Sequence, residues 1–208
     1  ELTAGSSMID PQSTTDTTMI DSDYIVKMAE KYPGRSIAVE DSELEISRVG
    51  SIQSGALTIG KVDGSSTASL IVKGQYKGDN IAIRNNSILS VESTGRIRLS
   101  DTLDISSQAI ATINGRVNTD KINGNIYIGQ NAQVVANTII GDVTVEQSST
   151  TFTQMTGALT INAGATVSGT KVIGSVIVDG DSNTRVSIDE IQNDLTLTTQ
   201  FGPIIDFK

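Results

Sequence analysis

The residues from Asp179 to Glu190 have the spacing of a calcium-binding loop. Alternating short side chains that carry oxygen are the pattern that surrounds a hard cation such as Ca²⁺. The five candidate ligands, at loop positions 1, 3, 5, 7 (through a backbone carbonyl) and 12, are Asp179, Asp181, Asn183, Arg185 and Glu190. Calcium is therefore the one cofactor that the sequence suggests.

Two features of the same segment favour a different interpretation. Thr184 stands at loop position 6, where the sharp turn of a calcium loop calls for glycine. The flanking segments 176–178 and 195–197 alternate apolar and polar residues as strands do, whereas a calcium loop of this type lies between helices. Since loops are normally rich in Asp, Asn, Ser and Gly, the alternative is a solvated turn between two strands.

Paired acids are the remaining candidates for catalysis. Asp101 and Asp104 flank a strand-like Leu103, and Asp189 is adjacent to Glu190. Carboxylate pairs cleave glycosidic bonds, so a polysaccharide-degrading β-helix is a legitimate hypothesis. However, the acids are scattered one per turn, and the chain is only 3% aromatic, whereas sugar-cleaving clefts usually present aromatic rings. We therefore expect no enzymatic activity and assign no catalytic residue.

Composition excludes several further classes. The 208 residues include no His and no Cys, which removes zinc sites built on these residues, cysteine nucleophiles, disulfides and every triad with a histidine base. A net charge of −9 and the lack of aromatic stacking surfaces argue against nucleic-acid binding. No apolar run approaches the roughly 18 residues of a membrane span. The chain begins with Glu1 rather than Met, so we expect a processed product.

The aliphatic residues indicate an all-β chain. There are 27 Ile and 16 Val but only 10 Leu, and β-branched side chains favour strands over helices. Ser and Thr contribute 24 residues each, so hydroxyl groups are abundant.

A repeat of the form Gly-x-apolar-x-apolar occurs in the second half of the chain. Successive copies begin at intervals of about 17 residues, and a degenerate copy follows at Asn193 after a slightly longer interval. The four regular copies begin at Gly124, Gly141, Gly157 and Gly174. Two copies in the first half, beginning at Gly55 and Gly95, fit the same template with less regular spacing.

Each unit contains two or three short strands with turns between them. This pattern predicts a single-stranded parallel β-solenoid over residues 36–200, with coils of about 17 residues. The four glycines should stack in one corner column. At ~4.8 Å per coil, roughly nine coils make a rod about 45 Å long.

The two ends of the chain have patterns of their own. Residues 1–20 are rich in Ser and Thr and predict a flexible leader, whereas residues 21–35 predict a short capping helix that is stopped by Pro33-Gly34. Residues 201–208 carry two of the three Phe and read either as a cap or as a connector that pairs with another subunit. That choice stays open.

The stretch from Gly124 to Gly180 resembles the bactofilin-type polymer-forming proteins, on the strength of segments 124–134 and 157–167. β-Helical bacterial surface adhesins and phage fibres use similar runs. The resemblance implies a self-polymerising cytoplasmic scaffold. The Thr-rich strands and the leader with its helix depart from the bactofilin pattern, and the balance of Ser, Thr, Asn and Gly is similar to that of exported surface proteins.

The sequence thus favours a non-catalytic structural or adhesive module on a bacterial or viral surface, acting as a rigid spacer or a filament subunit. The alternative is a bactofilin-like scaffold in the cytoplasm, and a third class is a carbohydrate-binding or carbohydrate-degrading β-helix. Expected partners are a second copy of the chain, another surface protein or a glycan.

Overall fold

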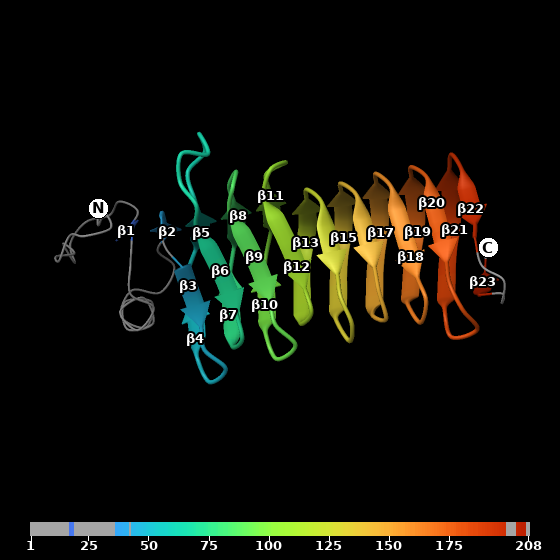
Figure 1. Cartoon of the computed structure of the whole chain (residues 1–208), viewed down its shortest axis with the longest axis horizontal. Helices are drawn as coiled ribbons and strands as arrows, with labels where there is room; N and C mark the ends of the chain where they lie inside the picture. Colours follow the sequence, from blue (N-terminus) through green and yellow to red (C-terminus); the bar gives the residue numbers. More distant parts are fainter. Residues whose placement is uncertain (1–16, 19–35, 42, 199–202, 207–208) are drawn as a thin grey trace.

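A computed structural model of the chain describes residues 17–18, 36–41, 43–198 and 203–206. Every regular element in these ranges is a β-strand, and the strands stack into an elongated parallel β-solenoid (Figure 1). The predicted all-β solenoid is confirmed. The described part of the chain contains no helix with the length and apolarity that a membrane crossing requires.

Two sheets form the walls of the solenoid, and all of their strand pairs are parallel. The nine-stranded sheet consists of β3 (Glu43–Ile46), β6 (Ser69–Val72), β9 (Ile88–Val91), β12 (Ile110–Ile113), β14 (Ile126–Ile128), β16 (Val143–Val145), β18 (Leu159–Asn162), β20 (Val176–Asp179) and β22 (Leu195–Leu197). The 14-stranded sheet consists of β1 (Thr17–Thr18), β2 (Ile37–Val39), β4 (Ser51–Gln53), β5 (Ala56–Ile59), β7 (Gln75–Gly78), β8 (Asn80–Ile83), β10 (Arg96–Leu99), β11 (Thr102–Ile105), β13 (Arg116–Asn123), β15 (Gln133–Ile140), β17 (Ser149–Thr156), β19 (Thr166–Ile173), β21 (Arg185–Gln192) and β23 (Ile204–Asp206).

The cross-section changes along the rod. In the first half a coil contains three short strands, for example β6, β7 and β8. From β13 onward, the two strands that belong to the 14-stranded sheet are joined into one strand of eight residues. Each later coil therefore has one short strand in one wall and one long strand in the other.

Stacked aliphatic side chains fill the interior. Along each strand inward and outward residues alternate, so register pairing places like residues above one another. One such row is Leu57, Ile81, Leu103, Ile122 and Ile139, and all five are fully buried. Burial of these rows supplies the main stabilisation of a chain without disulfides.

The predicted coil length is correct for the second half only. There Ile122 pairs with Ile139, whereas Leu57 in the first half pairs with Ile81, a longer step along the chain, and the coils average about 19 residues. The early coils are longer because they turn through extended loops, such as residues 60–68 between β5 and β6. At the same corner the later coils turn within two residues, the first of which is glycine.

The predicted glycine column is confirmed. Gly124, Gly141, Gly157 and Gly174 have φ angles of 120°, 140°, 133° and 155° and lead into the strands of the nine-stranded sheet. A Cβ on each of the last three would overlap the carbonyl oxygen of the glycine one coil before it. The first-half copies lie elsewhere: Gly55 and Gly95 precede β5 and β10, which belong to the 14-stranded sheet.

The terminal predictions are covered only in part. The predicted helix over 21–35 lies outside the described residues, as does most of the predicted leader over 1–20. Within that leader, Thr17–Thr18 forms β1 and pairs with Ile37 and Ala38 of β2. Within 201–208, β23 pairs with Arg185–Ser187 of β21 and adds a strand to the solenoid.

Candidate functional site

The carboxyl-terminal end of the solenoid exposes its apolar interior. Leu195 and Leu197 of β22 continue inward rows, because they pair with Val176 and Val178, which are fully buried. With no further described strand beside them, Leu195 is 38% exposed and Leu197 is 54% exposed. These two leucines, together with the outer edge of β22, are here called the open end.

The opposite end differs. Leu44 and Ile46 lie on β3, the terminal strand of the same sheet, in the rows that end at Leu195 and Leu197. Both are fully buried. The two ends of the rod are therefore unequal, and the exposed slice of core belongs to the carboxyl-terminal side.

The open end also has an unpaired backbone edge. Among the described strands β22 pairs only with β20, so the N–H and C=O groups on its other side have no partner strand. Such an edge is a template for another strand. Beside it, β23 extends the other wall, with Ile205 packed against the core and Ile204 exposed.

The segment that resembles a calcium loop folds as a corner turn. The Asp181 carboxylate accepts hydrogen bonds from the backbone N–H groups of Gly164 and Asn183 and from the Thr184 hydroxyl, each at 3.0 Å. Burial of the carboxyl opposes ionisation, but these hydrogen bonds prevail and lower the pKa of Asp181. Thr184 takes position 6 in place of glycine because its buried hydroxyl satisfies the turn.

Glu190 is not part of this turn. It lies on β21, a strand of eight residues, where Lys171 of the preceding coil pairs with it at 3.2 Å. That contact and a hydrogen bond from Gln192 lower the pKa of Glu190. Asp179 ends β20 and is exposed, and Arg185 directs its guanidinium to the Ser182 carbonyl oxygen at 2.7 Å. In the described residues no three acidic side chains gather closely enough to hold a metal, so calcium stays a prediction.

Asp101 and Asp104, two of the acids considered for catalysis, have structural partners, whereas Asp189 is exposed on β21. Asp104 pairs with Arg84 of the preceding coil at 3.2 Å and accepts a hydrogen bond from Asn123 of the next coil at 2.8 Å. Asp101 lies at a corner, where its carboxylate accepts a hydrogen bond from Thr102 at 2.8 Å. The contacts of Asp104 therefore link three consecutive coils, whereas the carboxylate of Asp101 contacts only the next residue in the chain.

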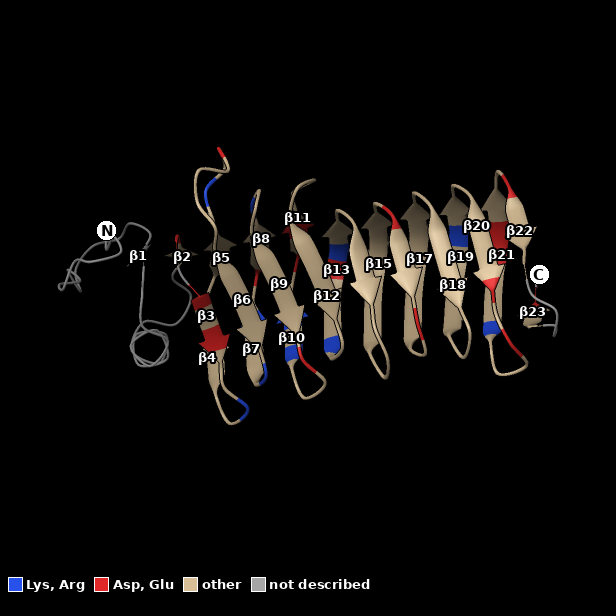
Figure 2. Cartoon of the chain, viewed as in Figure 1, with Lys and Arg blue, Asp and Glu red and all other residues tan. Residues whose placement is uncertain are grey.

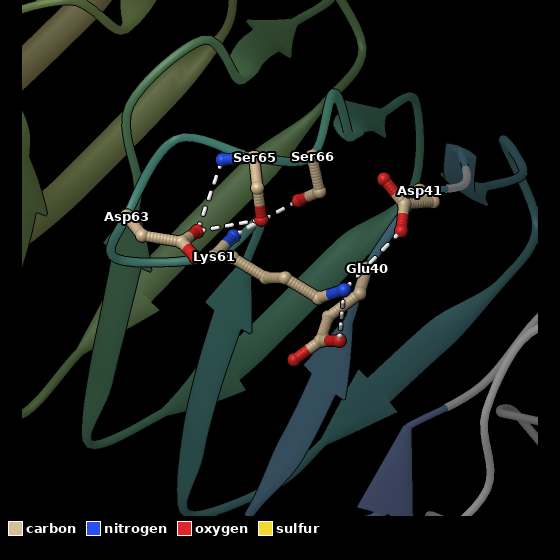
Figure 3. A network of polar contacts seen from close by, with 6 residues as sticks. All are labelled: Glu40, Asp41, Lys61, Asp63, Ser65 and Ser66. Carbon is tan, nitrogen blue, oxygen red and sulfur yellow. Dashed lines mark hydrogen bonds and ion pairs between the residues drawn. The ribbon is translucent and has the colours of Figure 1, made fainter.

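A second polar network stands in the long loop between β5 and β6 (Figure 3). The Lys61 ammonium pairs with Glu40 at 3.3 Å and with Asp41 at 3.5 Å, and these contacts raise its pKa. Asp63 accepts hydrogen bonds from the Ser65 hydroxyl at 2.7 Å and from the Ser65 N–H at 2.9 Å, which lower the pKa of Asp63. The network orders the loop against the first coil.

Comparison of the chain with protein-family models, with curated proteins and with solved structures found no match. The resemblance to bactofilins and surface adhesins is therefore carried by the sequence segments alone, and the solenoid is what the structure adds. The sequence did signal β22, as a degenerate repeat at Asn193. It could not signal the exposure of the two leucines, because that exposure depends on which segments of the folded chain pack against them.

Proposed function

We propose that the protein is a non-catalytic structural rod, a rigid spacer of a bacterial or viral surface, that associates with a second copy through its open end. The observation that carries this proposal is the exposure of Leu195 and Leu197 in rows that are otherwise buried. The hydroxyl-rich composition supports placement at a surface.

The sequence of β22 suits pairing with itself. Leu195, Thr196 and Leu197 read the same in both directions, so two antiparallel copies related by a two-fold axis at Thr196 place each Leu195 opposite a Leu197. A two-fold interface uses the same patch on both subunits, which this arrangement satisfies. Asp194 then faces Thr198 rather than another acid.

Tail-to-tail pairing joins two surfaces at which core residues are already exposed. Stacking the first coil of one copy on the last coil of another would place Leu44 over Leu195 and Ile46 over Leu197. However, Leu44 and Ile46 are fully buried and would first have to be uncovered. The favoured product is therefore a dimer, whereas head-to-tail growth is the filament expected of a bactofilin-like scaffold.

The test is sedimentation velocity of the wild type, Leu197→Lys and the control Ile177→Lys over a range of concentrations. Ile177 has the same 38% exposure as Leu195 but lies on the outer face of the sheet, one coil before β22. We expect the wild type and Ile177→Lys to dimerise and Leu197→Lys to stay monomeric with an unchanged circular dichroism spectrum. A wild type that stays monomeric at high concentration, or equal effects of the two lysines, would overturn the proposal. Growth beyond a dimer would favour the scaffold.

A further inference from the structure

Four cations gather on one outer face of the rod. They are Lys77 on β7, Arg96 and Arg98 on β10, and Arg116 on β13, and all are exposed. Figure 2 shows the blue colouring at the lower ends of β10 and β13. They come from three consecutive coils, and the coil register brings these strands together. We call them the basic strip.

The register sets like charges side by side. Arg96 pairs with Arg116 across β10 and β13, and Arg98 pairs with Lys77 across β10 and β7. Neighbouring strands lie about 4.8 Å apart, and like charges directly opposite each other destabilise a sheet. Among the described residues none of the four has an acid within ion-pair distance, although Lys61, Lys73, Arg84 and Lys171 all do.

The surface between these residues is hollowed. A shallow groove of about 160 Å³ is lined by Arg96, Arg98 and Arg116, with the amides of Asn118 and Gln133 at its side. A neighbouring hollow is lined by Lys77 and also by Arg98, which lines both hollows. The acidic residue in its lining, Asp79, accepts a hydrogen bond from the Ser100 hydroxyl at 2.9 Å. The strip thus combines exposed cations with amide and hydroxyl groups along the axis of the rod.

We infer that the basic strip binds an acidic polysaccharide. Guanidinium groups bind carboxylates in a forked geometry, and the neighbouring amides and hydroxyls suit sugar hydroxyls. A repeating anion satisfies several cations at once and relieves the repulsion that the register imposes. A nucleic acid fits less well, because the residues that line the two hollows include no aromatic ring on which bases could stack.

The experiment measures binding of polygalacturonate by isothermal titration calorimetry, with dextran and poly(dT) as comparisons. Arg96→Gln, Arg98→Gln and Arg116→Gln are combined in one variant. Its matched control combines Lys61→Gln, Lys73→Gln and Lys171→Gln, which lowers the net charge by the same amount at cations that have acidic partners.

We expect the arginine variant to bind polygalacturonate roughly tenfold more weakly or worse, as loss of charge-assisted hydrogen bonds predicts, and the lysine variant to bind like the wild type. Binding should weaken with added salt, and the arginine variant should gain thermal stability without ligand. Equal losses in both variants, no binding by the wild type, or equally tight binding of poly(dT) would overturn the inference. Leu197→Lys should bind polygalacturonate like the wild type, so the basic strip and the open end are tested independently of each other.

Discussion

Glycines at the corners have φ angles that other residues rarely adopt, and each glycine in the column lies against the backbone of the coil before it. Gly141, at φ 140°, is the clearest example, because a Cβ there would overlap the carbonyl of Gly124. This close approach lets consecutive coils keep the spacing of a parallel ladder.

Replacing Gly141 by alanine should therefore lower the free energy of unfolding by about 1–3 kcal/mol or more, since backbone strain and a steric overlap add. The matched control is Gly50→Ala, where the nearest atom to a Cβ is the Ser47 hydroxyl oxygen at 3.0 Å and φ is not in the positive region. Urea unfolding of both variants measures the difference. An equal effect would contradict the role of the column.

Tyr76 is an aromatic residue whose hydroxyl is buried inside the rod. It is 1% exposed, its hydroxyl and that of Ser54 are hydrogen-bonded at 2.7 Å, and burial raises its pKa to about 12 although that bond opposes the shift. In the unfolded chain the ordinary pKa of tyrosine is 10.0. Between these values the unfolded state has already lost the proton that the folded state keeps.

The contribution of the Tyr76 hydroxyl to the free energy of unfolding is thus fully present below pH 10 and is lost as the pH rises toward 12. The loss should approach about 3 kcal/mol across that window. Urea unfolding over an alkaline series measures it, with Tyr76→Phe as the variant that lacks the titration. Lys61 and Lys73 also have raised pKa values, so both proteins should show some loss. Identical slopes for the two proteins would refute this account of Tyr76.

At the scale of elements, the turn between β20 and β21 is built around Asp181. Asp181→Ala should lower the melting temperature with or without Ca²⁺, because the Asn183 N–H loses its acceptor and the Gly164 N–H keeps only the Thr184 hydroxyl. Glu190→Gln should leave this turn intact. The calcium hypothesis predicts instead that Ca²⁺ raises the melting temperature of the wild type and that Glu190→Gln abolishes the rise. Thermal unfolding of the three proteins with Ca²⁺ and with a chelator separates the two.

Acid titration gives an independent check on the turn. The lowered pKa of Asp181 means that its contribution is present above the ordinary value of 3.8 and is lost as the pH falls through the folded-state pKa. Asp63 and Glu190 have lowered pKa values as well. The loss of stability on acidification should therefore be smaller in Asp181→Ala than in the wild type, but it should not disappear.

The strands of the second half could be predicted because one residue type, glycine, marks the same corner in each coil. In the first half the corners are made differently. Gly74, Gly95 and Gly115 lie at another corner, where a Cβ on each would overlap main-chain atoms of the neighbouring coil. The sequence template matched both kinds of corner and could not separate them. That is why the coil length was correct for the later coils and too short for the earlier ones.

Contacts between side chains of different coils could not be predicted from the sequence for a related reason. Arg96 and Arg116 belong to different coils, and their separation along the chain has no meaning until the register of β10 and β13 is known. The pairing of Glu190 with Lys171 likewise depends on the register of β19 and β21. An error of a few residues in coil length moves every such contact, so patches and ion pairs need the structure.

At the scale of the whole molecule, function depends on how the two ends of the rod are closed. The first coil has buried core residues, whereas the last coil is covered unevenly: β23 adds a strand beside β21, and β22 has no such neighbour among the described strands. This unevenness bears on the two interpretations of residues 201–208. A cap protects the core beneath it, and a connector offers its own surface to another subunit.

Deleting residues 201–208 separates these interpretations. Since Ile205 packs against the core and β23 pairs with β21, we expect the deletion to lower stability and to cause aggregation of the monomer, as removal of a cap would. Two substitutions in β23 refine the test. Ile205→Ser should destabilise the protein, whereas Ile204→Ser, at a residue that is 56% exposed, should leave both stability and dimerisation unchanged. Sedimentation and thermal unfolding of the three variants measure this. A stable deletion variant that no longer dimerises, or loss of dimerisation in Ile204→Ser alone, would instead identify β23 as the connector and remove β22 from that role.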